Sequence, residues 1–413
     1  MTGYEFEEVQ ERVILIGVQI SDGDDTEESL AELGDLAFTA GAEVAGTVIQ
    51  RREAIHPGTY IGKGKIDEVR NLLWETEATG VICDDELSPA QMNNLQRELD
   101  CKVMDRTLLI LDIFARHATT REGKIQVELA QLRYRAARLA GLGNSLSRLG
   151  GGIGTRGPGE KKLEMDRRVI RTRISHLKRE LDEVIRHREL IRSQRRRSEQ
   201  RIVALVGYTS VGKSAIFRTL TGADVLEDAK LFATLDTTTR AIRLSGSQEV
   251  LLTDTVGFIR KLPHHLIEAF KSTLEEACCA DILVHVVDSA SPQMEAQMHV
   301  VYETLHELGA DKKPVITVFN KQDLLPDRKL YRDMRADFCI AASAHTGEGM
   351  EELRGDIAEV LRSQKIYIER LYTYDKAGLI QLIRRRGELL EEDYRPEGIF
   401  VRAYVPQDIY MDV

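Results

Sequence analysis

The sequence predicts a multidomain α/β protein with two parallel α/β domains, a long helical hairpin between them and a small α+β appendage. Three observations support this fold class. At 413 residues, the chain is longer than the about 100–150 residues of a typical domain. Apolar strand patterns alternate with helical patterns near its N-terminus and again in its second half. A glycine-rich phosphate-binding loop follows one of these strand patterns. The expected domains are 1–120, 121–198, 199–363 and 364–413.

Residues 10–118 indicate a small parallel α/β domain, because strands rich in valine and isoleucine alternate with amphipathic stretches. The expected strands are Val13–Ile20, Glu43–Ile49, Val81–Cys83 and Lys102–Met104, and the expected helices are Glu28–Ala40, Ile66–Glu75, Gln91–Leu99 and Leu108–Arg116. The single tryptophan, Trp74, is expected in the core. Gly62-Lys63-Gly64-Lys65 fits a phosphate cradle and also a turn with surface lysines, and the sequence leaves both interpretations open.

Two amphipathic helices follow, and each presents one apolar face. The first face consists of Ile125, Leu129, Leu132, Ala136 and Leu139; the second consists of Ile170, Ile174, Leu177, Leu181, Val184 and Ile191, with Arg188 at one seam position. Two such faces cover each other most simply in an antiparallel hairpin. Its tip is expected to be a glycine-rich loop at 141–160, where eight glycines in 20 residues leave too few apolar side chains for a core.

The hairpin is strongly basic although the chain is acidic. Residues 121–201 hold 22 Lys and Arg against 10 Asp and Glu, whereas the whole chain has a net charge of −10. A local positive field favours nucleic acid whatever the overall charge. The expected RNA-binding residues are Arg148 and Arg156 at the tip and Arg195, Arg196 and Arg197 at the junction with the next domain. A solvated helical face is the alternative interpretation.

The phosphate-binding loop lies between the apolar run 202–206 and a helical pattern, which is the context that this motif requires. Its residues are Gly207, Tyr208, Thr209, Ser210, Val211, Gly212, Lys213 and Ser214. Backbone amides of such a loop face the phosphates. Lys213 is expected to act on the β- and γ-phosphates, and the Ser214 hydroxyl is expected to ligate Mg²⁺.

A second motif follows the apolar strand pattern 250–252 and consists of Asp254, Thr255, Val256 and Gly257. Asp254 is expected to hold Mg²⁺ through water. The Gly257 N–H is expected to contact the γ-phosphate and to sense its loss.

Two further motifs identify the base as guanine. Asn320, Lys321, Gln322 and Asp323 follow the apolar stretch 314–319, and Ser343, Ala344 and His345 follow the strand pattern 338–340. The Asp323 carboxylate suits the guanine N1–H and exocyclic amine, a donor pair that adenine lacks. The ordered motifs therefore predict a P-loop, Ras-like domain that binds and hydrolyses GTP with Mg²⁺.

Several segments resemble the HflX family, GTPases of the Obg-related branch that bind the large ribosomal subunit. They are Phe232-Ala233-Thr234-Leu235-Asp236, Asp254–Ile259, Gly150–Glu160, Thr39–Val44 and Thr59–Lys65. The resemblance implies that residues 232–236 contact the nucleotide. Among several neighbouring threonines it selects Thr234 to complete the Mg²⁺ shell and to act in catalysis with Lys213 and Gly257.

The resemblance also implies a function. The glycine-rich loop of HflX-like proteins enters the large subunit near its peptidyl-transferase region, so the chain is expected to bind the 50S subunit and its RNA and to remodel or split ribosomes. ATP binding by the N-terminal domain is a further implication. The alternative is a regulatory GTPase whose basic arm acts on a protein or a membrane.

Two departures bear on turnover. Ser210 replaces an asparagine that helps to bind a catalytic potassium ion in related GTPases, so potassium stimulation is not expected. Phe258 stands where Ras-like enzymes place a water-orienting glutamine, as in the whole HflX group, and a phenyl ring cannot orient water. Hydrolysis by the isolated protein is therefore expected to be slow, with catalysis completed by the ribosome.

The composition of the chain indicates the cellular compartment in which the protein is expected. No apolar run approaches 18 residues, no signal-peptide pattern begins the chain, and five cysteines are scattered without metal-site spacing. These features predict a cytoplasmic protein with reduced thiols and no transmembrane segment, and we expect a monomer.

Overall fold

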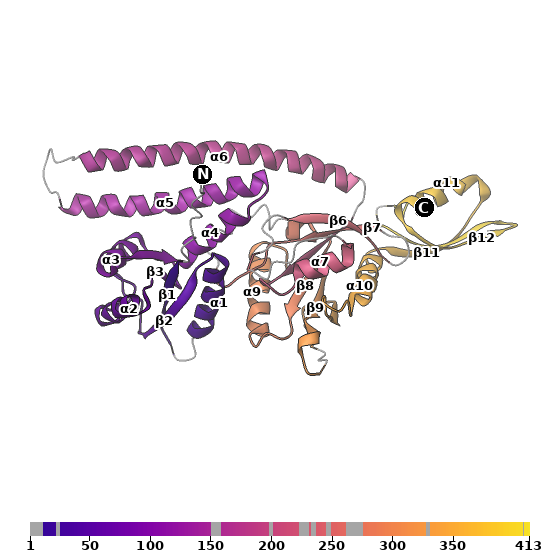
Figure 1. The fold of residues 1–413 in the computed structure, drawn as a ribbon. Helices are drawn as coiled ribbons and strands as arrows, with labels where there is room; N and C mark the ends of the chain where they lie inside the picture. The colour runs from indigo at the N-terminus through magenta and orange to yellow at the C-terminus, as the bar shows by residue number, and fades with distance from the viewer. Residues whose placement is uncertain are drawn as a thin grey trace, which may run out of the picture. The chain divides into compact units, whose positions relative to one another are not determined.

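A computed structural model of the chain describes residues 11–21, 25–149, 158–197, 201–222, 231–232, 237–244, 249–261, 276–327, 331–407 and 409–413 (Figure 1). The chain forms two compact units. The first unit comprises residues 1–188 together with 228–236 and 259–272, and the second comprises the remaining residues. No helix among the described residues is both long enough and apolar enough to cross a membrane.

The N-terminal domain is a four-stranded parallel sheet in the order β2-β1-β3-β4. Its strands are β1 Arg12–Gln19, β2 Glu43–Arg51, β3 Gly80–Cys83 and β4 Lys102–Asp105, and its helices are α1 Thr26–Thr39, α2 Lys63–Thr76, α3 Pro89–Leu99 and α4 Arg106–His117. Every predicted element of this domain is therefore present. Alternate residues of β1 point to opposite faces, and Ile14 and Ile16 pack against α2 and α3 through residues such as Leu73 and Leu95.

Local sequence signals begin two of these helices. At α3 the Ser88 Oγ accepts a hydrogen bond from the Gln91 N–H, and the Gln91 Oε1 accepts one from the Ser88 N–H, which forms a capping box. At α4 the Asp105 carboxylate accepts the Leu108 N–H. The prediction for Trp74 was wrong, because its side chain is 85% exposed on α2.

The helical hairpin consists of α5 Arg121–Leu149 and α6 Pro158–Arg197, which lie side by side (Figure 1). Its seam contains seven of the predicted residues: Ile125, Leu129 and Leu177 are buried, and Leu132, Ile174, Leu181 and Val184 are partly buried against them. The seam arginine, Arg188, pairs with Glu122 at 3.1 Å, so its charge is compensated where the apolar pattern breaks.

The expected loop at 141–160 is too long. Helix α5 continues to Leu149 and α6 begins at Pro158, a residue whose fixed φ suits the first turn of a helix. Arg148 therefore lies within α5, and Arg195–Arg197 are the last residues of α6. Arg156 lies outside the described residues.

The second α/β domain has a six-stranded sheet in the order β10-β9-β8-β5-β7-β6. All pairs are parallel except β6 with β7. The strands are β5 Arg201–Gly207, β6 Thr238–Arg243, β7 Glu249–Asp254, β8 Ile282–Asp288, β9 Val315–Asn320 and β10 Phe338–Ala341, and the helices include α7 Lys213–Thr221, α9 Met294–Glu307 and α10 Met350–Ser363. The predicted motifs follow β5, β7, β9 and β10 at the carboxyl edge, where parallel sheets bind ligands.

The C-terminal appendage is an antiparallel sheet in the order β11-β13-β12. Its elements are β11 Ile366–Tyr372, α11 Ala377–Arg386, β12 Glu388–Arg395 and β13 Gly398–Val405. Residues of β13 and α11, including Val401 and Ile383, form a separate core. The sequence pattern predicts a helix around Lys376–Arg386 and a strand around Ile399–Val405, and both are present, whereas β11 and β12 were not predicted.

Candidate nucleotide-binding site

The phosphate-binding loop joins the end of β5 to the start of α7. Gly207 and Gly212 have φ values of 153° and 95°, and a Cβ atom at these positions would overlap the Val286 carbonyl oxygen and the Asn320 side chain, respectively. Only glycine fits this backbone without strain. Ser210 has a φ of 56° and is exposed on the loop.

Lys213 is folded onto the loop. Its side chain is buried, and its Nζ donates hydrogen bonds to the carbonyl oxygens of Gly207 at 3.1 Å and Tyr208 at 2.6 Å. Burial lowers the pKa of Lys213 to about 8, although the neighbouring Asp254 carboxylate acts in the opposite direction. Phosphate oxygens in place of these carbonyls would raise the pKa of Lys213, because an anion stabilises the ammonium form.

Ser214 and Asp254 meet beside the loop. The Ser214 Oγ donates to the Asp254 Oδ2 at 2.8 Å, so the two predicted metal-binding groups are adjacent. Thr255 and Val256 instead turn into the core: the Thr255 hydroxyl donates to the Leu205 carbonyl oxygen at 2.6 Å, and Val256 is buried. Their side chains therefore support the strand rather than face a ligand.

Gly257 and Phe258 are tied to the phosphate-binding loop by backbone hydrogen bonds. The Thr209 N–H donates to the Phe258 carbonyl oxygen at 2.8 Å, and the Phe258 N–H donates to the Gly207 carbonyl oxygen at 3.1 Å. A Cβ atom on Gly257 would lie 2.9 Å from the Lys213 Nζ, so only glycine allows this approach. The Phe258 ring is buried and offers no polar group to a water molecule.

The expected base pocket is assembled from three loops. The Asp323 Oδ1 accepts the Ser343 hydroxyl at 2.6 Å, which orients the carboxylate. The Asn320 Oδ1 accepts the Ala344 N–H at 2.9 Å, and the Asn320 Nδ2 donates to the Val211 carbonyl oxygen at 2.8 Å. Asn320 therefore links the base pocket to the phosphate-binding loop.

The structure describes three further predicted nucleotide-binding residues, and their contact with the nucleotide stays a prediction. The Phe232 ring packs edge-to-face on Phe114 of α4 at 4.7 Å, within the first unit. The Gln322 side chain is buried and donates to the Ser289 hydroxyl at 2.9 Å, so it braces the loop. His345 is exposed. Ala233, Thr234, Leu235 and Asp236 lie outside the described residues.

Comparisons with known proteins agree with this site. The chain matches family models described as GTP-binding GTPase N-terminal at residues 27–115, GTP-binding GTPase middle region at 117–195 and 50S ribosome-binding GTPase at 202–321. It is 61% identical over 406 residues to GTPase HflX of Lacrimispora saccharolytica, covering 98% of this chain and 96% of that one. The chain belongs to the HflX GTPase family.

Other relatives are more distant. GTPase HflX of Escherichia coli is 42% identical over 357 residues, covering 86% of this chain and 84% of that one. A crystal structure of a GTP-binding protein from the archaeon Sulfolobus solfataricus in complex with GDP is 25% identical and covers 85% of this chain and 98% of that one, with a TM-score of 0.44. As an HflX-family member with a P-loop domain, the protein is a GTP-hydrolysing enzyme.

One residue that supports the base pocket of this HflX GTPase was not singled out from the sequence. Asp288 ends β8, and its carboxylate pairs with the Lys321 Nζ at 2.6 Å. The signal was the stretch Ile282–Val287 before it, which is apolar except for His285 and marks another strand end at the same sheet edge.

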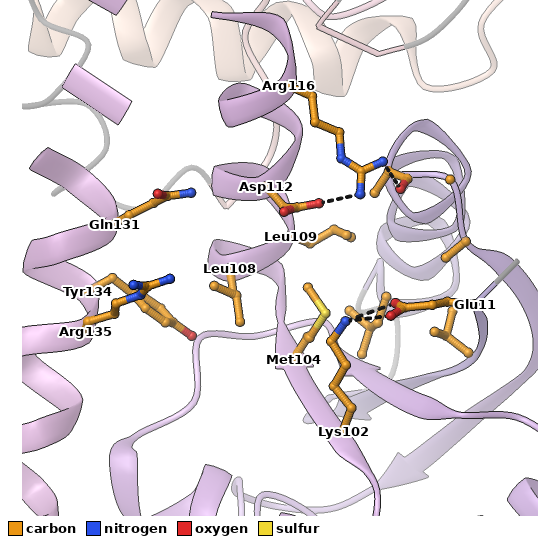
Figure 2. Close-up of a pocket in the computed structure, with 15 residues that line it drawn as sticks. Glu11, Lys102, Met104, Leu108, Leu109, Asp112, Arg116, Gln131, Tyr134 and Arg135 are labelled. Carbon is orange, nitrogen blue, oxygen red and sulfur yellow. Dashed lines mark hydrogen bonds and ion pairs between the residues drawn. The ribbon is translucent and has the colours of Figure 1, made fainter. Parts of the chain in front are cut away.

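The N-terminal domain of this HflX GTPase has a cavity of about 840 Å³, but it does not involve residues 62–65. Figure 2 shows Tyr134 and Arg135 of α5 on one side and Arg116 of α4 on the other. At 62–65, the Gly62 N–H donates to the Gln50 side chain at 2.8 Å, and Lys65 pairs with Glu68 at 2.8 Å. A Cβ atom at Gly62 would meet the Arg52 guanidinium, so this glycine makes room for a neighbouring side chain. ATP binding at 62–65 stays a prediction.

Proposed function

We propose that this HflX-family GTPase binds the large ribosomal subunit through its helical hairpin and remodels or splits ribosomes in a cycle driven by GTP. The observation that carries the proposal is a set of exposed cations on α6 that make no ion pair with a carboxylate among the described residues. They are Arg168, Arg171, Lys178, Arg179 and Arg186.

Unpaired cations along one helix are suited to phosphates, because binding releases the counterions that those phosphates hold. By contrast, Arg173 on the same helix pairs with Glu128 of α5 at 2.7 Å and serves the hairpin itself. A regulatory GTPase that uses this arm on a protein or a membrane is the alternative. The family model at 202–321, described as a 50S ribosome-binding GTPase, favours ribosomal RNA.

Mg²⁺ fits the residues beside the phosphate-binding loop. Ser214 and Asp254 offer adjacent hydroxyl and carboxylate oxygens, the donor types that Mg²⁺ prefers. We assign these two residues, with Thr234, to hold the ion, which when bound would neutralise charge on the β- and γ-phosphates. Lys213 adds a second positive charge, and the Gly257 N–H reports whether the γ-phosphate is present.

Slow hydrolysis by the isolated protein follows from the position of Phe258. Its backbone is fixed by two hydrogen bonds to the phosphate-binding loop and its ring is buried, so the residue after the second motif cannot position a nucleophile. We infer that the ribosome supplies or orders the missing group. We also place the protein in the cytoplasm as a monomer.

The test is co-sedimentation with purified 50S subunits in the presence of a nonhydrolysable GTP analogue or GDP. We expect the protein to migrate with the subunit in the analogue and to release in GDP. Replacing Arg171 and Arg179 by glutamine should weaken this association and lower its salt slope by up to about two units. Arg243→Gln is the matched control, because this exposed arginine already pairs with Glu249 in the GTPase domain.

Binding that is the same in GDP and in the analogue would contradict a GTP-driven cycle. Association with anionic vesicles but not with 50S subunits would favour the alternative function.

A further inference from the structure

The residues that follow the second nucleotide motif are held by the N-terminal domain. Gly257 and Phe258 belong to the second unit, whereas 259–272 belong to the first. Within the first unit, Ile259 is buried, and the Arg260 guanidinium pairs with the Asp25 carboxylate. Lys261 contacts two carboxylates: its Nζ pairs with Asp84 at 2.5 Å and with Asp85 at 2.8 Å.

Both carboxylates that bind Lys261 are also held by other side chains of the N-terminal domain. They follow β3 directly at the carboxyl edge of the N-terminal sheet. The Asp84 side chain is buried and accepts hydrogen bonds from the Ser29 hydroxyl at 2.8 Å and the Arg106 guanidinium at 2.8 Å. Asp85 accepts the Tyr60 hydroxyl at 2.6 Å.

Such carboxylates form a preorganised cation site, since their side chains have little conformational freedom left to lose when a cation binds. Burial lowers the pKa of Lys261, but Asp84 and Asp85 raise it further, so the net shift is upward and the lysine stays charged.

The segment before the second motif is held in the same unit. The Leu231 N–H donates to the Thr39 hydroxyl at 3.2 Å, and the Phe232 ring packs on Phe114. The first unit therefore contacts residues on the amino-terminal side of β6 and on the carboxyl-terminal side of β7, the two places where a GTPase responds to the γ-phosphate.

The chain connects Lys261 to the phosphate-sensing glycine. Lys261 follows Gly257 by four positions in the chain, a stretch that spans at most about 14 Å when extended. Gly257 lies against the Lys213 Nζ and Thr209, where the γ-phosphate would meet its N–H. An ion pair at Lys261 therefore acts within four residues of the glycine whose N–H would meet the γ-phosphate.

We propose that Asp85 and Lys261 form a positioning ion pair through which the N-terminal domain favours GTP over GDP. The pair holds the segment after Gly257 near the γ-phosphate site, so it raises the affinity for the triphosphate and leaves the affinity for the diphosphate unchanged. By thermodynamic reciprocity, GTP strengthens the attachment of this segment to the N-terminal domain, and GDP does not. The N-terminal domain thus binds this segment more tightly when GTP is bound than when GDP is bound.

The experiment measures the dissociation constants of a nonhydrolysable GTP analogue and of GDP for the isolated full-length protein. It compares the wild type with Lys261→Met, Asp85→Asn and the double variant. Each single change should weaken analogue binding about two- to fivefold, the range of a partly exposed ion pair, with GDP affinity unchanged. The double variant should be no weaker than Lys261→Met, because that change already removes the pair with Asp85.

Asp85 is the appropriate partner to change, because removal of Asp84 would take away one of the two carboxylates that pair with the buried Arg106 guanidinium and would destabilise the fold. Lys102→Met is the matched control: its ammonium pairs with Glu11 at 3.0 Å at the opposite edge of the same sheet. This control should leave both affinities unchanged.

Three outcomes would overturn the proposal: equal losses for the analogue and GDP, additive losses in the double variant, or unchanged analogue affinity. A thermal melting curve for each variant separates an affinity change from loss of fold. These measurements need no ribosomes, so their outcome is independent of the proposed binding to the 50S subunit.

Discussion

Binding of GTP should take up a proton at alkaline pH, because the ligand restores the charge of Lys213. With a pKa of about 8, roughly three quarters of the Lys213 side chains are neutral at pH 8.5 and roughly a tenth at pH 7. Phosphates should return this pKa towards its usual value above 10, so binding takes up about 0.7 proton at pH 8.5 and about 0.1 at pH 7. The affinity should accordingly fall as pH rises above 8.

Isothermal titration calorimetry with a nonhydrolysable analogue measures this uptake from the dependence of the binding enthalpy on the ionisation enthalpy of the buffer. Lys213→Arg is the control, since a guanidinium stays charged throughout this range and should abolish the difference between the two pH values. Equal proton uptake by the wild type at pH 7 and pH 8.5, or proton release, would refute the reasoning.

The same pKa has a consequence for folding. The folded-state pKa of Lys213 is lower than its unfolded-state value, so between pH 8 and about 10.5 the unfolded chain binds more protons than the folded one. The contribution of Lys213 to the free energy of unfolding of the nucleotide-free protein should therefore increase with pH across this window. Comparison of wild-type and Lys213→Arg denaturation curves isolates this contribution.

The remaining predictions concern base choice, turnover and the hairpin. Asp323→Asn should lower GTP affinity by about 1.5–3 kcal/mol and improve binding of xanthosine triphosphate, and calorimetry with both nucleotides checks it. Because of Phe258 and Ser210, phosphate release by the isolated protein should be slow and equal in K⁺ and Na⁺, and 50S subunits should raise kcat at least tenfold; fast turnover without a ribosome response would contradict this. Arg148→Ala combined with Arg156→Ala should slow ribosome splitting without changing GTP affinity, whereas splitting at the wild-type rate would reject a role for the tip. Neutralising the three arginines that end α6 should lower the salt slope of 50S binding by up to about one unit per phosphate contact.

The nucleotide site was predictable because its residues lie next to one another in short motifs at strand ends. Ser214 and Asp254 are far apart in sequence, yet parallel strands β5 and β7 bring them to one edge, where the hydroxyl and carboxylate meet at 2.8 Å. Apolar runs located these strands, and the motif after each run located the edge. The pairing of Asp323 with Ser343 follows from the same geometry.

Three features of the fold could not be read from local sequence patterns. The ring of Phe232 packs on Phe114, a partner that no local pattern reveals, and its contact with the nucleotide stays a prediction. Strand β12, Glu388–Arg395, carries charges on both faces and so shows no apolar alternation; its backbone pairing with β13 defines it. Trp74 follows the buried Leu73 by one residue, a rotation of about 100° around the helix, which carries it to the exposed side.

The position of Asn320 has a consequence for attempts to change the nucleotide that this protein accepts. Its side chain occupies the space beside Gly212 and bonds both to Val211 and to Ala344, so one amide joins the loop that wraps the phosphates to the loop that frames the base. A redesign that moves the base loop would also disturb the phosphate loop. Altered base preference is therefore easier to obtain at Asp323, whose carboxylate bonds only to Ser343 among the described residues, than by exchanging the whole motif.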